Sequence, residues 1–250
     1  MSSKKMEQLR QAFQPVLREF LDCAAMRALA AGELSVSQYQ SVLREIFHQT
    51  RENPQLHAMS MIYLRGRQRD FVKRYFAHAG SEVGHDQLAL NDIETLGGEV
   101  SRIPYENPLP ATSALVAFAY YQLQRGSPLS YLGYVFFLEF MPTHVGEDVA
   151  RWLHNIGVTP NAMTFLRDHA EIDMAHNRIM EQYVDGLVVT DADYDTVAHA
   201  MRVTGRLYGR MYDEAVNDVS QPFERGWCHE ELAVDGKIAD ELVTERSIAS

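Results

Sequence analysis

The spacing of apolar residues is the feature that most constrains the fold of this chain. Nearly every long segment places them three and four positions apart, the period of an amphipathic helix. Leu9, Phe13, Leu17 and Phe20 follow this spacing and predict a first helix over residues 4–31. Strand-like alternation and fixed-period repeats are absent from the sequence. The pattern therefore predicts an all-α bundle.

Glycine, proline and capping residues divide this bundle into seven helices. Gly32 ends the first helix, and Ser35 with Gln38 predicts a capping box at the start of the second. Pro54 predicts a kink or a restart in that second helix. The other helices are expected at 67–96, 111–125, 128–155, 160–187 and 191–218, with a proline-rich loop at 103–110.

The periodicity fades near residue 218. We therefore expect one helical domain over residues 1–218 and a C-terminal extension over 219–250, in which acids outnumber basic residues. The extension is expected to be either an ordered arm, packed through Phe223 and Trp227, or a disordered tail.

Composition excludes several classes of function. With 23 Lys and Arg against 34 Asp and Glu, the net charge of −11 argues against a nucleic-acid partner. The N-terminus has no apolar signal region, and the most apolar window, residues 131–141, is too short to cross a membrane, so we expect a cytoplasmic protein without a membrane partner. Two cysteines cannot form a disulfide framework or a thiolate zinc site. Ten histidines and the acids remain as the pool of metal ligands.

Two groups of residues have the spacing of metal ligands on helices. Glu82 and His85 lie three positions apart in the predicted helix 67–96, although such a pair alone is common on solvated surfaces. His169, Asp173 and His176 form one stripe in the predicted helix 160–187, next to apolar neighbours. Burying a carboxylate and two imidazoles beside aliphatic side chains is unfavourable unless a partner such as a metal ion is present.

Glu139 is a further candidate, because it lies alone in the most apolar segment of the chain. The alternative is a buried glutamate that pairs with an arginine or caps a neighbouring helix. Carboxylate-rich sets with [E/D]xxH pairs build di-iron and di-manganese centres in helical bundles, and mixed oxygen and nitrogen ligands suit iron. The predicted metal ligands are Glu82, His85, Glu139, His169, Asp173 and His176. They leave open positions on two iron ions, Fe(II) or Fe(III), for O2 and a small-molecule substrate.

The motifs SEVGHDQLALNDIETLG, FLEF and FLRDHAEIDMAHNRIM resemble those of the haem-oxygenase-like di-iron oxidases, relatives of the TenA and pyrroloquinoline-quinone-synthase folds. The resemblance covers most of residues 30–217. It implies a seven-helix haem-oxygenase-like fold, a di-iron cluster assembled from ferrous iron and oxygen, and oxidative chemistry. Relatives act on different acids, so the expected substrate is a small carboxylate-bearing metabolite derived from an amino acid, a fatty acid or an aromatic acid. A homodimer is expected for this fold, and an external reductant is possible.

Within this resemblance, Glu139 is the expected bridging carboxylate, and each [E/D]xxH set is expected to hold one iron, with His169 as an additional nitrogen ligand. Five aromatic residues are expected either to line an apolar chamber or to form plain core: Tyr120, Tyr121, Phe136, Phe137 and Phe140.

Two other functions remain open from the sequence. A metal-independent TenA-like hydrolase or cofactor-free oxidase would have the same fold, and a thiaminase-type reaction would need a thiolate from Cys23 or Cys228. A non-catalytic bundle that binds iron, or a partner protein through its acidic surface or tail, is the third possibility.

Overall fold

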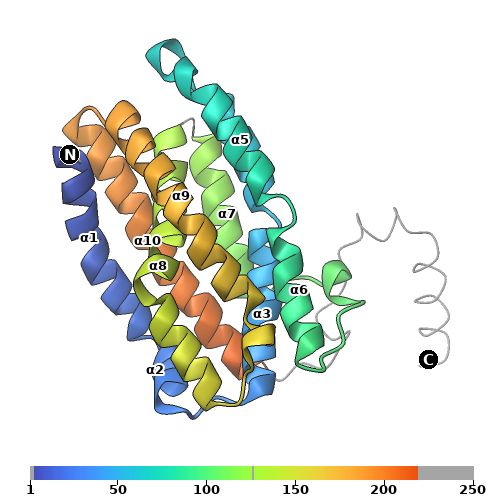
Figure 1. The fold of residues 1–250 in the computed structure, drawn as a ribbon. Coiled ribbons are helices and arrows are strands. Elements are labelled where there is room, and N and C mark those ends of the chain that lie inside the picture. The colour runs from blue at the N-terminus through green and yellow to red at the C-terminus, as the bar shows by residue number, and fades with distance from the viewer. Residues whose placement is uncertain (1–2, 126, 219–250) are drawn as a thin grey trace, which may run out of the picture.

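The computed structural model describes residues 3–125 and 127–218, without the side chains of residues 67, 128 and 168–176. This part of the chain folds into ten α-helices and three short 3-10 helices and contains no strand, which confirms the all-α class (Figure 1). The α-helices are α1 (Lys4–Leu21), α2 (Ala24–Ala31), α3 (Val36–Thr50), α4 (Asn53–Met61), α5 (Val72–Glu82), α6 (His85–Thr95), α7 (Pro110–Gln124), α8 (Pro128–Asn155), α9 (Thr164–Leu187) and α10 (Asp191–Asn217). The 3-10 helices are η1 (Gly66–Phe71), η2 (Ile103–Tyr105) and η3 (Pro160–Ala162).

The described residues contain ten α-helices where seven were predicted, because three of the predicted helices are each broken in two. The break before Pro54 was predicted and is confirmed. The break between α1 and α2 was not, and it depends on a distant residue: the Asp213 carboxylate of α10 accepts a 2.8 Å hydrogen bond from the Ala25 backbone N–H, which satisfies a free donor at the start of α2. The third break separates α5 from α6.

A capping box and the carboxylate of Asp92 fix where two further helices begin. The predicted capping box of Ser35 and Gln38 is present at the start of α3. Asp92 of α6 accepts hydrogen bonds from the backbone N–H groups of Thr164 (2.8 Å) and Phe165 (2.9 Å), so α6 caps α9 from outside. Because of this cap and the η3 turn, α9 begins four residues later than the predicted start at residue 160.

Helix α10 lies at the centre of the bundle, where it packs against α1, α2, α3, α7 and α8, most extensively against α8 (Figure 1). The α8–α10 contact depends on small residues. A Cβ atom added to Gly133 of α8 would lie 2.3 Å from the backbone oxygen of Val197 in α10. The two backbones therefore approach closely at this point.

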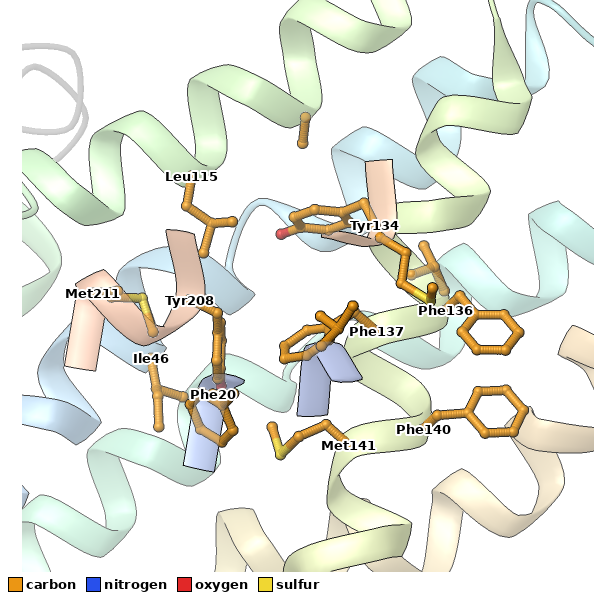
Figure 2. Close-up of a cluster of buried hydrophobic side chains, with 14 of the residues drawn as sticks. Phe20, Ile46, Leu115, Tyr134, Phe136, Phe137, Phe140, Met141, Tyr208 and Met211 are labelled. Atoms are coloured by element: carbon orange, nitrogen blue, oxygen red, sulfur yellow. The ribbon is translucent and has the colours of Figure 1, made fainter. Parts of the chain in front are cut away.

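Of the five aromatic residues that were expected either to line a chamber or to form core, the three phenylalanines of α8 form core. Phe136, Phe137 and Phe140 of α8 are buried, with ring centroids 6.1–6.2 Å from that of Phe13 in α1. Figure 2 shows Phe136 and Phe140 on the side of α8 that faces away from Ile46. Tyr121 is 55% exposed. The large cavity described below is lined by other residues.

Within the described ranges, no helix combines the length and apolarity that a membrane span requires. The predicted C-terminal extension over 219–250 lies outside the described residues, as does Cys228.

Candidate metal centre

Glu82 and His85 are brought together at the junction between two helices, and not by a turn within one helix. Glu82 is the last residue of α5 and His85 the first of α6, with Gly84 between them at a φ of +94°. Glycine tolerates this left-handed conformation, which ends one helix and lets the next begin. The Nδ1 atom of His85 lies 3.5 Å from Oε1 of Glu82. The predicted pair is therefore confirmed as neighbours, but the predicted continuous helix over 67–96 is wrong.

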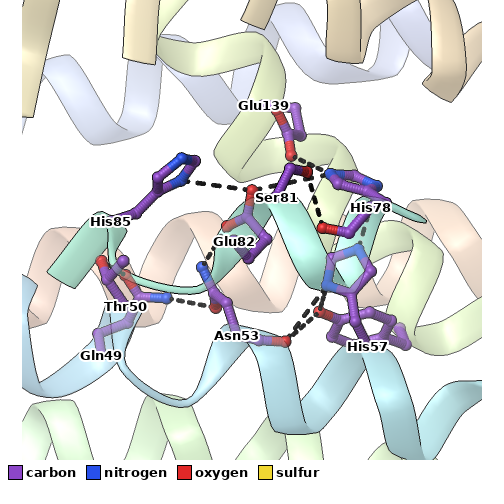
Figure 3. Close-up of polar contacts among 10 residues, drawn as sticks. Gln49, Thr50, Asn53, His57, His78, Ser81, Glu82, His85 and Glu139 are labelled. Carbon is purple, nitrogen blue, oxygen red and sulfur yellow. Dashed lines mark hydrogen bonds and ion pairs between the residues drawn. The ribbon is translucent and has the colours of Figure 1, made fainter. Parts of the chain in front are cut away.

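His78 lies next to both of the predicted ligand carboxylates, Glu82 and Glu139, although it was not among the predicted ligands. Its Nε2 atom lies 3.1 Å from Oε1 of Glu139 and 3.8 Å from Oε1 of Glu82 (Figure 3). One ligand atom from each of these three residues lies within 4.8 Å of the others, and all three side chains are buried. They come from two helices that are distant in sequence, α5 and α8. We call His78, Glu82 and Glu139 the buried triad.

A signal for His78 is present in the sequence. The spacing His78-x3-Glu82-x2-His85 repeats that of His169-x3-Asp173-x2-His176 with one acid exchanged for the other. Only Glu82 and His85 of the first set are among the predicted ligands. His78 was considered as a contact to the ligands or to the substrate, against the more common surface or capping residue, and was left out of the predicted ligands.

The side chains of His169, Asp173 and His176 lie outside the described residues, so their predicted role as ligands stays a prediction. The backbone of α9 is described on both sides of them. Phe165 lines the same cavity as Glu82 and Glu139. Further along α9, Asn177 Nδ2 lies 3.3 Å from Oγ1 of Thr143, one turn after Glu139 in α8. Helix α9 thus runs along α8 next to the buried triad.

The buried triad concentrates negative charge in the interior. Glu82 is 5% and Glu139 7% exposed. Burial is the largest influence on the pKa of Glu82 and raises it, and the Glu139 carboxylate also raises it, whereas the hydrogen bond with His85 lowers it. The pKa of Glu82 lies below its usual value as a result. An ionised carboxylate buried beside another acid favours a bound cation.

A second histidine positions the first. His57 Nε2 lies 3.2 Å from Nδ1 of His78 (Figure 3). The Tyr131 hydroxyl lies 2.6 Å from Nδ1 of His57. Burial, reinforced by the nearby His78, lowers the pKa of His57 to about 3, so this ring is neutral near pH 7. A neutral imidazole can accept a hydrogen bond from Nδ1–H of His78, and in this tautomer the lone pair of His78 Nε2 faces the carboxylates, where a metal ion could bind.

We predict that His57→Leu weakens iron binding roughly 10–100-fold, the range typical of lost outer-shell partners. The leucine removes the 3.2 Å contact between His57 Nε2 and His78 Nδ1 and leaves an apolar side chain of similar size in its place. Anaerobic titration with ferrous iron would measure the change, with the exposed His154→Leu as a matched control. An unchanged iron affinity in His57→Leu would show that His57 does not position His78.

Amide side chains orient the carboxylate of Glu82. The new helix that starts at Pro54 places Asn53 at the beginning of α4. Its Nδ2 atom lies 3.5 Å from Oε2 of Glu82, and its Oδ1 atom accepts a 3.0 Å hydrogen bond from Gln49. Gln49 also donates to the Tyr134 hydroxyl at 2.7 Å. This network connects α3, α4 and α8 behind the buried triad.

Two residues of the buried triad, Glu82 and Glu139, line a cavity of about 90 Å³, several times the roughly 10–15 Å³ that one water needs. Glu82, Glu139, Gln49 and Asn53 lie on its wall, and most of the remaining lining is apolar. Buried carboxylates on the wall of a largely apolar cavity are a suitable arrangement for a reactive centre that must exclude bulk water.

The candidate thiol of Cys23 lacks the properties of a nucleophile. Burial raises its pKa to about 12, and the Asp213 carboxylate raises it further, although backbone N–H groups at the start of α2 act in the opposite direction. A thiol with this pKa is almost entirely protonated near pH 7. Cys23 also lies outside the lining of the cavity.

The family of the chain follows from a sequence comparison. The model of a family described as iron-containing redox enzymes matches residues 40–209, well over half of the chain. This protein therefore belongs to that family of iron-containing redox enzymes. No curated protein matches the chain.

Solved structures show the same fold. A domain of unknown function with a heme oxygenase-like fold from Shewanella denitrificans is 24% identical, with a TM-score of 0.78 over 84% of this chain and 91% of that one. A TenA homologue from Pseudomonas syringae is 12% identical, with a TM-score of 0.73 over 87% and 94%. A TenA homologue from P. horikoshii is 12% identical, with a TM-score of 0.68 over 85% and 98%. These similarities confirm the predicted haem-oxygenase-like, TenA-like fold.

Proposed function

We propose that this protein is a non-haem di-iron oxidase or oxygenase that activates O2 and acts on a small metabolite. The observation that carries the proposal is the buried triad, whose two carboxylates line a largely apolar cavity, in a chain of the iron-containing redox enzyme family. One imidazole and two carboxylates provide the mixed nitrogen and oxygen donors that iron accepts. Thiolates, which would favour zinc, are absent from the triad.

The ligands divide between two ions in this proposal. His78, Glu82 and His85 would hold the first ion, and His169, Asp173 and His176 from α9 would hold the second. Glu139 would bridge the two, because α8 packs against α9 and its Glu139 side chain contacts His78. The equal spacing of the two histidine–acid–histidine sets supports this division.

Iron, when bound, supplies the electrons and the oxygen chemistry that side chains lack. The protein residues provide the setting. The carboxylates of Glu82 and Glu139 balance the charge of the ions, and His57 holds the imidazole of His78 in the binding tautomer. Asn53 orients Glu82, and the apolar wall of the cavity excludes water while it positions the substrate.

Charge also supports a carboxylate-bearing substrate. Three ligand carboxylates, Glu82, Glu139 and Asp173, against two ferrous ions leave one net positive charge. An anionic group on the substrate would neutralise it.

Anaerobic titration with ferrous iron tests the proposal. We expect close to two irons per chain and a transient absorbance when O2 is admitted, with O2 consumption that depends on the iron. A zinc-loaded sample serves as the control, since zinc has no redox chemistry. A protein that takes up no iron, or whose activity survives chelation, would contradict the proposal and favour the metal-independent hydrolase.

A further inference from the structure

Helix α5 has an inner face that packs against the bundle and an outer face that is exposed. Its inner face carries the buried Tyr75, His78 and Glu82, and its main packing partners are α4 and η1. Phe76 lies on the outer face and is 69% exposed. An open groove of about 660 Å³ follows this face, and we call it the outer groove. Its lining residues are Leu64, Arg69, Val72, Lys73, Phe76 and Ala77.

Large apolar side chains are concentrated in this part of the surface. Among the described residues, five large hydrophobic side chains are exposed, and Ile62, Phe76 and Val83 are three of them. Figure 1 shows α5 on the outside of the bundle, where the turn before it extends beyond the neighbouring helices. Exposed apolar side chains that gather on one element, instead of being scattered singly, mark an interaction surface.

The outer groove is basic, in a protein that is acidic overall. Residues 65–74 contain five basic residues and one acid, Asp70, whereas the net charge of the whole chain is −11. Arg69 and Lys73 of this segment line the groove, and both are exposed. Charge complementarity therefore selects an occupant that is acidic as well as apolar.

The C-terminal extension contains a segment with this chemistry. Residues 231–245 have five acids against one basic residue, Lys237, so their net charge of −4 is opposite to the +4 of residues 65–74. Residues 219–230 have only two acids and one basic residue, so the acidic charge is concentrated in the later segment. The large aliphatic residues between its acids are Leu232, Val234, Ile238, Leu242 and Val243.

The extension is long enough to reach the outer groove. Gln38 Nε2 donates a 2.9 Å hydrogen bond to the Val216 carbonyl oxygen, so α10 ends beside the start of α3. From there α3 and α4 lead towards Leu64, and their 15 and 9 residues cover at most roughly 36 Å of helix axis. Residues 219–230, when extended, span about 40 Å at roughly 3.3 Å per residue. The segment 231–245 can therefore lie at the groove.

We propose that residues 231–245 dock in the outer groove of their own chain. Their aliphatic side chains cover Phe76 and Val72, and their carboxylates lie beside Arg69 and Lys73. The extension is then an arm that packs over the outer face of α5, whose inner face belongs to the candidate metal centre. This docking depends neither on iron nor on the proposed function.

Zero-length crosslinking of the full-length protein with a carbodiimide tests the docking, because the reagent joins amines and carboxylates that are in contact. Of the four lysines in the sequence, Lys73 lines the outer groove, whereas Lys4 and Lys5 lie on α1. We expect mass spectrometry to identify crosslinks between Lys73 and the acids of residues 231–245. Lys4 and Lys5 are internal controls and should give none with this segment.

The mass of the crosslinked protein shows whose arm fills the groove. A crosslink within one chain leaves it at 28.5 kDa, whereas a crosslink between two copies doubles the mass. Crosslinks of Lys73 to the segment that occur only in the doubled species would assign the groove to the arm of a second copy and overturn docking within one chain. If Lys73 gives no crosslink to the segment, or no more than Lys4 and Lys5, the docking is wrong.

A charge exchange provides an independent test. At low ionic strength, Arg69→Glu with Lys73→Glu should release the arm and accelerate cleavage after Glu245 by a glutamyl endopeptidase roughly ten-fold. Adding Asp240→Lys and Glu241→Lys to this variant should restore slow cleavage, because the charges are opposite again. Arg202→Glu with Arg210→Glu, at exposed positions of α10, is the matched control and should cleave like the unmodified protein. Equal cleavage rates in all four proteins would overturn the docking.

Discussion

Glu139→Gln is expected to lose iron, with an affinity reduced by more than the roughly 10–100-fold typical of an outer-shell partner. The substitution keeps the shape of the side chain but removes the charge that, in our proposal, both ions share. Metal-dependent stabilisation should disappear as well. At an iron concentration of about 100 times Kd, the bound metal stabilises the folded state by about 2.7 kcal/mol. For a chain of this size, that corresponds to a Tm increase of roughly 5–10 °C, which the variant should lack.

Glu139→Gln should fold without metal, because the substitution removes the charge repulsion between the two neighbouring buried carboxylates, Glu82 and Glu139. Glu45→Gln is the matched control. Glu45 is fully buried but accepts hydrogen bonds from the Leu109 backbone N–H (3.0 Å) and the Thr112 hydroxyl, so its role is to cap α7. The Glu45→Gln substitution should lower the free energy of unfolding and leave the iron stoichiometry unchanged. Iron uptake by Glu139→Gln equal to that of the unmodified protein would exclude Glu139 as a ligand.

Gly133→Ala is expected to destabilise the protein by about 1–3 kcal/mol, the usual range for overpacked cores. Helix propensity alone predicts the opposite sign, since alanine is favoured over glycine by about 1 kcal/mol inside a helix. The added Cβ atom would lie 2.3 Å from the Val197 carbonyl oxygen and 2.9 Å from the Met201 backbone nitrogen. Backbone atoms cannot rotate away as a side chain can. Thermal unfolding should show a Tm lower by roughly 2–12 °C.

Gly146→Ala is the control on the same helix. A Cβ atom at Gly146 would meet nothing within 4 Å, so only the propensity term remains and this variant should be more stable by up to about 1 kcal/mol. Changes of opposite sign in the free energy of unfolding for Gly133→Ala and Gly146→Ala would confirm the close approach of α8 and α10. Stabilisation by both would contradict it.

The local features of the fold could be predicted from the sequence because they depend on residues close together in the chain. The helical period, the capping box at Ser35 and the restart at Pro54 are all present in the structure. The break before α2 could not be predicted in this way, since the Asp213 carboxylate that caps α2 comes from α10. The start of α9 depends in the same way on Asp92.

The sequence by itself determined the class of chemistry: acids and histidines at helical spacing in a bundle with two cysteines, and among them Glu82, His85 and Glu139. Only the tertiary structure showed that His78 completes the buried triad. A histidine four residues before a glutamate is common on any helix, and its meaning here comes from α8, which brings Glu139 to within 3.1 Å of it. Spacing along a chain defines which side chains share a helix face. The packing of helices decides what that face meets, and with it the cavity, the orienting His57 and the exclusion of water.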